Sequence, residues 1–205
     1  MDLNNQSKPT STSKEPSSPR MKSPVRSNIL SLTMIAMFTA LIAVCTLVTI
    51  PMPPPFVPFT LQTLAVFLAG SFLGMKRGIV SVLVYILLGM VGVPVFAQFK
   101  SGISALMGPT GGFIIGFIAT AAIVGFFQDR FGNRLWSLVL SMSLGLIACY
   151  AFGTIWFVVV YQQSKGSMDI WNALSICVFP FLLFDAVKIL AAVLLSYRLH
   201  KLIKT

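Results

Sequence analysis

The chain has 205 residues, of which 56% are hydrophobic and 10% are charged. Soluble domains carry about 25% charged residues, so this composition excludes an ordinary soluble domain and indicates a membrane protein. The net charge of +10 does not indicate nucleic-acid binding, because the basic residues are distributed in the way that orients membrane proteins.

The expected elements begin with a basic tail, residues 1–28, which is rich in Ser and Pro and nearly free of large apolar residues. Such a segment cannot offset its ordering entropy by burial, and we expect it to be disordered. Residues 29–202 form one predicted transmembrane domain.

Six apolar segments in this domain are candidates for helices that cross a bilayer, which needs roughly 20 residues each. They cover residues 28–50, 59–73, 79–93, 108–127, 135–161 and 180–199. The proline run at 51–58 and the turns at 74–78 and 128–134 separate neighbouring segments, and 171–178 is a candidate interfacial helix. The predicted fold class is therefore all-α, a polytopic bundle of six transmembrane helices.

Basic residues indicate the orientation of the bundle. The tail, the 74–78 turn, the 128–134 loop and the C-terminus together hold twelve Lys and Arg residues, whereas the opposite loops hold only Lys100 and Lys165. The positive-inside rule then places both termini in the cytoplasm of a multi-pass plasma-membrane protein.

Two charges interrupt the last apolar segment, in the run FPFLLFDAVKIL. Asp185 and Lys188 are three residues apart and share one helix face with Phe181 and Ala192. A charge at the bilayer centre costs roughly 2.5–3.5 kcal/mol, and such residues usually face a bundle interior or a wet cavity. The alternative is an internal salt bridge that only holds helices together.

The run GPTGG opens the fourth segment on the same outer side. We expect Pro109 in the first helical turn, and Gly111 and Gly112 allow a ligand to approach a helix N-terminus, which favours anions. A simple helix-start turn is the other interpretation.

Aromatic and amide side chains are frequent at the outer ends of the segments. Each alone suits an anchor or packing residue, but together they would line a cavity for a small ligand with an apolar body and polar ends. They are Gln62, Tyr85, Phe96, Gln98, Trp156 and Tyr161.

Enzymatic chemistry finds no support in the sequence. It contains no Walker A pattern, no carboxylate dyad or Ser-His-Asp arrangement in the apolar segments, and a single histidine near the C-terminus. We expect no cofactor and no metal.

Four runs in order, VPFTLQTLAVFLAGSFLG, YILLGMVGVPVF, GPTGGFIIGF and PFLLFDAVK, resemble the BioY family. These are the biotin-specific substrate-binding subunits of energy-coupling factor (ECF) vitamin transporters. The resemblance covers about residues 30–200 and implies capture of biotin from outside, with a membrane coupling protein and ATPase subunits that hydrolyse ATP.

The resemblance also implies roles for individual residues. Asp185 would accept hydrogen bonds from the ureido N–H groups of biotin. Lys188 would contact either the carboxylate or the ureido oxygen of biotin. The GPTGG backbone and the 95–106 loop would close over the ligand. Phe113 stands where the family often has tyrosine, and Lys100 falls in a stretch that is usually glycine-rich.

A small-residue pair in the first segment, Ala36 and Ala40, matches the AxxxA pattern with which these subunits dock on the coupling protein; such pairs also occur in many membrane helices. Two other functions remain open at this point. One is binding of a different vitamin on the same architecture, and the other is an ion-coupled carrier in which Asp185 titrates.

Overall fold

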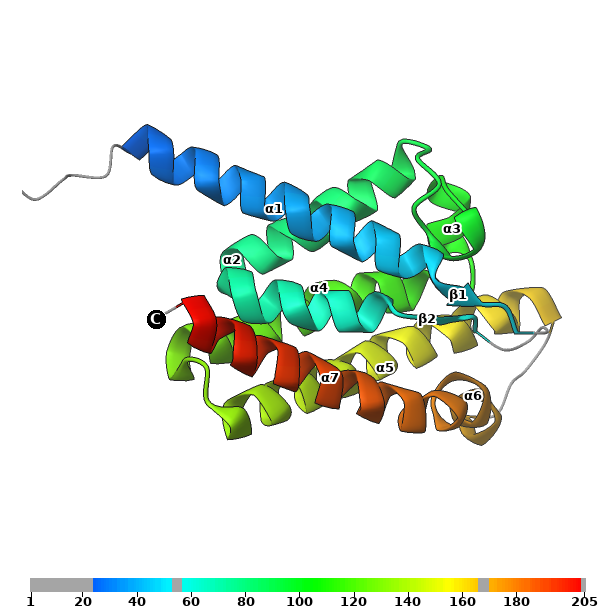
Figure 1. Ribbon diagram of the computed structural model, residues 1–205. Helices are drawn as coiled ribbons and strands as arrows, with labels where there is room; N and C mark the ends of the chain where they lie inside the picture. The colour runs from blue at the N-terminus through cyan, green and yellow to red at the C-terminus, as the bar shows by residue number, and fades with distance from the viewer. Residues whose placement is uncertain (1–23, 53–56, 166–169, 204–205) are drawn as a thin grey trace, which may run out of the picture.

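The computed structural model describes residues 24–52, 57–165 and 170–203 of the chain (Figure 1). The predicted disordered tail therefore lies outside the described residues up to position 23. In chain order the elements are α1 Pro24–Leu47, β1 Thr49–Ile50, β2 Phe59–Thr60, α2 Gln62–Met90, η1 Ala97–Phe99, α3 Ile103–Met107, α4 Gly111–Phe131, α5 Leu135–Lys165, α6 Ile170–Cys177 and α7 Phe179–Ile203.

Five helices, α1, α2, α4, α5 and α7, are long and apolar enough to cross a membrane within the described parts of the chain. In α1 the apolar stretch begins at Asn28, as expected from the sequence, although the helix itself begins at Pro24. In α7 Pro180 lies in the first turn, where a missing N–H costs nothing. The prediction of a mainly helical membrane protein is confirmed.

The end of the first predicted segment was wrong, because the helix stops at Leu47 and the following residues are extended. Thr49 and Ile50 pair antiparallel with Thr60 and Phe59 in a two-residue ladder. The sequence predicts Phe59 in the second helix, but this residue lies in β2. Pro51 and Pro58 lack the backbone N–H that a helix needs, and the described residues next to them pair as strands instead.

Helix α2 contains both predicted segments on either side of the 74–78 turn. Only Gly74 leaves the helical conformation, with φ 74° and ψ −178°, which a residue with a Cβ adopts only under strain. At this elbow, Asp129 of α4 accepts a hydrogen bond from the Met75 N–H at 2.9 Å, and a Cβ on Gly74 would clash with the Asp129 carboxylate. The chain reverses direction in a single residue, so that the two arms of α2 form a helical hairpin (Figure 1).

Helix α4 begins later than the sequence indicated. Thr110 precedes its first residue, Gly111, so Pro109 lies before the helix and not in its first turn. The Gly108–Pro109–Thr110 stretch forms a turn in which the Gly111 N–H donates to the Gly108 carbonyl at 3.0 Å.

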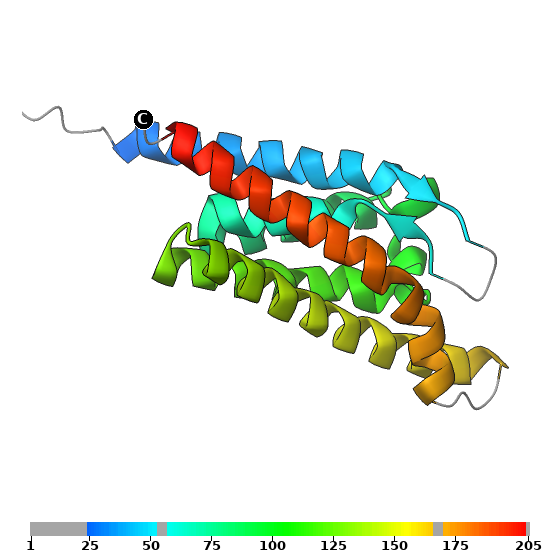
Figure 2. The same cartoon turned by 60° about the horizontal axis from the view of Figure 1, so that its bottom comes forward.

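The two ends of the bundle differ in character (Figures 1 and 2). The start of α1, the elbow of α2, the α4–α5 loop and the end of α7 share one end, which carries Lys76, Arg77, Arg130, Arg134 and Arg198. The strand pair, α3 and α6 lie at the other end. A cavity lined by Asp185 and Lys188 opens among the elements of that second end.

Candidate functional site

The charged pair of α7 faces the interior of the bundle. Asp185 is 3% exposed and Lys188 is 6% exposed, whereas Leu183 and Val187 on the opposite face are 74% and 61% exposed. The i, i+3 spacing therefore places both charges on the buried side of the helix, as the sequence predicted.

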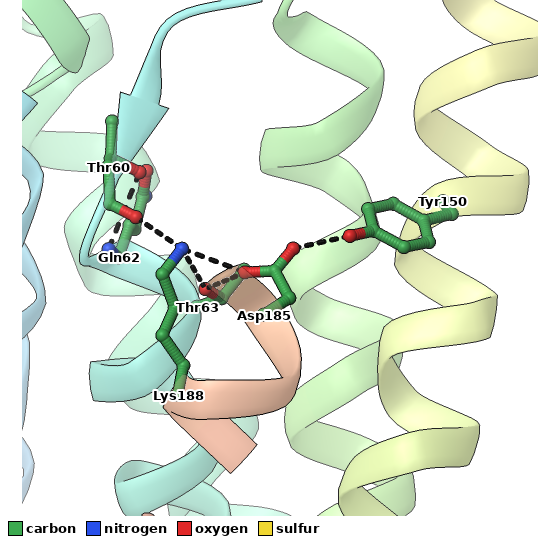
Figure 3. Close-up of polar contacts among 6 residues, drawn as sticks. All are labelled: Thr60, Gln62, Thr63, Tyr150, Asp185 and Lys188. Carbon is green, nitrogen blue, oxygen red and sulfur yellow. Dashed lines mark hydrogen bonds and ion pairs between the residues drawn. The ribbon is translucent and has the colours of Figure 1, made fainter. Parts of the chain in front are cut away.

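Asp185 accepts hydrogen bonds from three protein groups (Figure 3). The Lys188 ammonium lies 2.7 Å from Oδ1, and the Thr63 hydroxyl donates to the same oxygen at 3.3 Å. The Tyr150 hydroxyl of α5 donates to Oδ2. An ionised carboxylate offers about four acceptor positions, so Asp185 keeps one for a further donor.

Lys188 uses its whole hydrogen-bonding capacity within the protein. An ammonium has three donors, and those of Lys188 reach Asp185, the Thr60 carbonyl at 2.6 Å and the Thr63 hydroxyl at 3.1 Å. The ammonium also lies 4.1 Å from the centre of the Phe59 ring, within the range of a cation–π interaction. Lys188 thus ties the end of β2 to α7.

These groups lie on the wall of a cavity with about 720 Å³ of empty space, including its open mouth. Polar lining residues gather around Asp185, and aromatic residues of α4, α7 and the 95–100 loop cover the rest. The lining comprises Val57, Pro58, Thr60, Gln62, Thr63, Phe96, Ala97, Lys100, Ala105, Thr110, Phe113, Ile114, Phe117, Cys149, Tyr150, Cys177, Phe181, Asp185 and Lys188.

The formal charges of the lining are those of Lys100, Asp185 and Lys188. Burial raises the pKa of the Cys177 thiol in α6 to about 12, so this group is neutral at pH 7. The cavity wall carries a net charge of +1, and the surplus belongs to Lys100, because Asp185 and Lys188 neutralise each other.

Two of the sequence-predicted residues position the 95–100 loop, which forms part of the cavity wall. Phe96 is 2% exposed and packs edge-on against Tyr85, with 5.7 Å between ring centres. Tyr85 is fully buried, and its hydroxyl donates to the Val95 carbonyl at 3.1 Å. Phe96 lines the cavity and Tyr85 supports it from behind.

Six predicted residues line the cavity and six do not. Gln62, Phe96, Lys100, Phe113, Asp185 and Lys188 belong to the lining, whereas Gly111, Gly112, Tyr85, Gln98, Trp156 and Tyr161 do not.

Those outside the lining serve packing and turn geometry. A Cβ on Gly112 would clash with Trp156, and the Trp156 indole donates to the Gly108 carbonyl at 3.0 Å. Tyr161 stacks on Phe157 near the C-terminal end of α5, with 5.8 Å between ring centres. Gln98 is exposed and has φ 61°, a left-handed turn conformation.

Sequence reasoning missed Thr60, Thr63 and Tyr150, which complete the network around Asp185 (Figure 3). A signal existed for the first two, since they flank Gln62 in the run FTLQT. For Tyr150, a hydroxyl in the middle of an apolar segment of 31 residues was the available signal.

Gln62 contributes the other buried polar group of the lining. It is 4% exposed, and its Nε2 finds no hydrogen-bond partner among the described residues. A buried amide without a partner costs free energy, so this position is suited to a ligand that supplies the missing group.

The small pair on α1 lies away from the cavity. Ala36 and Ala40 are both exposed and share one helix face, while α1 packs mainly on α2. Within the described parts of the chain, no other element covers the helix face that carries these two alanines.

Known proteins match this chain over most of its length. The model of the BioY family matches residues 16–205. A biotin transporter BioY of Thermotoga maritima is 42% identical over 165 residues, covering 80% of this chain and 92% of the relative. A probable biotin transporter BioY of Lysinibacillus sphaericus is 38% identical over 178 residues, covering 86% and 89%.

A solved structure agrees with the fold as well. The 2.1 Å crystal structure of the S-component for biotin from an ECF-type ABC transporter superposes with a TM-score of 0.75 at 28% identity, over 85% of this chain and 93% of that one. The chain therefore belongs to the BioY family.

Proposed function

We propose that this chain is the biotin-binding S-component of an ECF transporter, which captures biotin from outside the cell in the plasma membrane. The observation that carries the proposal is the buried Asp185–Lys188 pair on the wall of the cavity. Relatives that share most of the chain's length are named biotin transporters, and a solved biotin S-component has the same fold.

Asp185 and Gln62 supply the polar recognition in this proposal. The acceptor position left on Asp185 takes one ureido N–H of biotin, and the Gln62 amide pairs with the neighbouring edge of the same ring. An amide suits this role because it places a donor beside an acceptor, as a cyclic urea does. Phe96, Phe113 and Phe181 then cover the apolar ring system and chain.

The glycines of GPTGG act indirectly. Gly111 and Gly112 allow α3 and Trp156 to approach the start of α4, and Tyr85, Gln98 and Tyr161 shape the loops around the mouth.

The membrane topology follows from the distribution of charge. Each arm of α2 forms one crossing segment, which with α1, α4, α5 and α7 gives six. The basic end faces the cytoplasm under the positive-inside rule, so both termini are cytoplasmic and the cavity opens outward.

Transport requires partners in this proposal, because the sequence holds no Walker A pattern. ATPase subunits hydrolyse ATP, and the exposed Ala36 and Ala40 of α1 dock on the transmembrane coupling protein. Small residues let two helix backbones approach closely in a membrane.

Isothermal titration of the purified chain with biotin, thiamine and riboflavin tests the proposal. Biotin alone should bind, without nucleotide. Asp185→Asn should weaken biotin about 10- to 100-fold, since a hydrogen bond to a charged group is worth roughly 1.5–3 kcal/mol. The matched control is Asp129→Asn at the basic end, which should bind as the parent does. Equal binding of biotin by Asp185→Asn and the parent would refute the site.

A further inference from the structure

Two lysines line the cavity, and their environments differ. Lys188 is 6% exposed and paired with Asp185. Lys100 is exposed at the rim and forms no ion pair within the described parts of the chain. The deep end of the cavity is thus neutral overall, and the surplus positive charge lies at its mouth.

Lys188 is unsuited to bind a carboxylate in this arrangement. All three of its donors are used by Asp185, Thr60 and Thr63, and an approaching anion would come close to the negative Asp185. To bind an anion, Lys188 would have to give up at least one of these three contacts, and giving up Asp185 would leave a buried carboxylate without its counter-ion, which is costly.

Lys100, in contrast, is held in place by its backbone while its ammonium stays available. Its carbonyl accepts from the Phe96 N–H at 3.0 Å, and the Gly102 N–H donates to Gly89 of α2 at 2.7 Å. Within the loop that the Phe96–Lys100 bond closes, Gln98 and Phe99 both adopt positive φ, 61° and 58°. Strained non-glycine turns persist where the surrounding structure fixes them, and they cluster at ligand sites.

We infer that Lys100 binds the carboxylate of the ligand at the mouth of the cavity, and that Lys188 positions Asp185 without contacting the carboxylate. The inference rests on the proposed function and adds an orientation to it. The ring with its neutral N–H and C=O groups lies deep against Asp185 and Gln62, and the acid chain points outward. Lys100 then determines specificity for a free acid over a neutral derivative.

The test pairs two ligands that differ only in charge, biotin and its primary amide, biotinamide. Isothermal titration of the parent and of Lys100→Met gives four affinities. Removing an exposed ion pair costs little, so Lys100→Met should weaken biotin about two- to fivefold and leave biotinamide unchanged. Lys100→Arg should retain the preference for biotin. Lys76→Met, which removes an exposed lysine at the opposite end, should alter neither affinity.

Salt provides a second readout. Exposed charges more than about 10 Å apart are screened at 0.1 M ionic strength, and closer exposed pairs weaken as well. Raising salt from 20 to 500 mM should therefore reduce the biotin affinity of the parent more than that of Lys100→Met.

Each other outcome rejects the inference. An unchanged ratio of biotin to biotinamide affinity in Lys100→Met would overturn it. So would a ratio that changes in Lys188→Met but not in Lys100→Met, because the carboxylate would then contact the deep lysine. If the parent binds neither ligand, the proposed function fails, and the inference fails with it; binding of both ligands with an unaltered ratio rejects the inference alone.

Discussion

Removing Lys188 tests how the buried pair stabilises the protein. In Lys188→Met the apolar stem is retained, but Asp185 loses its counter-ion while it remains 3% exposed. The neutral donors Thr63 and Tyr150 stay in place. Breaking a buried pair by removing one partner costs about 3–5 kcal/mol, which corresponds to roughly 6–20 °C in melting temperature for a chain of this size.

The double variant Asp185→Leu/Lys188→Met removes both charges at once. Because a buried ion pair gains little over well-packed apolar groups, this variant should melt above the single Lys188→Met variant, although it should bind no biotin. The assay is thermal unfolding of the detergent-purified proteins by tryptophan fluorescence, with Lys76→Met as the control for loss of an exposed lysine.

The reasoning is refuted if Lys188→Met melts within about 2 °C of the parent, a difference of roughly 1 kcal/mol or less. It is also refuted if the double variant is less stable than the single one, since the cost would then not arise from an uncompensated charge.

Three further variants probe the surroundings of the site. Tyr150→Phe removes one donor to Asp185 and should lower the free energy of unfolding by about 1.5–3 kcal/mol, measured by thermal unfolding. Gln98→Gly relieves a positive φ outside the cavity lining, so titration should show biotin affinity within about twofold of the parent, because no contact is lost. Gly112→Ala introduces a Cβ against Trp156 and should lower the melting temperature, since overpacking costs roughly 1–3 kcal/mol. An unchanged melting temperature would mean that α4 and α5 can move apart to accommodate the methyl group without loss of stability.

The prediction of the loops was less successful than that of the helices. Apolar length identifies a crossing helix without reference to neighbours, and Asp185 and Lys188 were found because a charge in an apolar segment is costly wherever it lies. For residues 95–106, by contrast, the local sequence pattern predicted a plain loop, whereas the structure has η1, α3 and a left-handed turn at Gln98. Contacts with Gly89 and Tyr85 fix that conformation.

Four features could be predicted from the amino-acid sequence without a structure: the class of protein, the apolar segments, the basic end and the charged pair on one face of the last helix. Each depends on composition or on spacing within a single segment, which local physical chemistry governs. Three further features became visible in the folded chain. Tyr150 and Thr63 donate hydrogen bonds to Asp185, and all three donors of Lys188 are used. Gly112 and Trp156 pack together instead of lining the cavity. These contacts join residues far apart in the chain, since Thr63 and Asp185 are separated by 122 positions. No periodicity in the sequence indicates which helix faces meet.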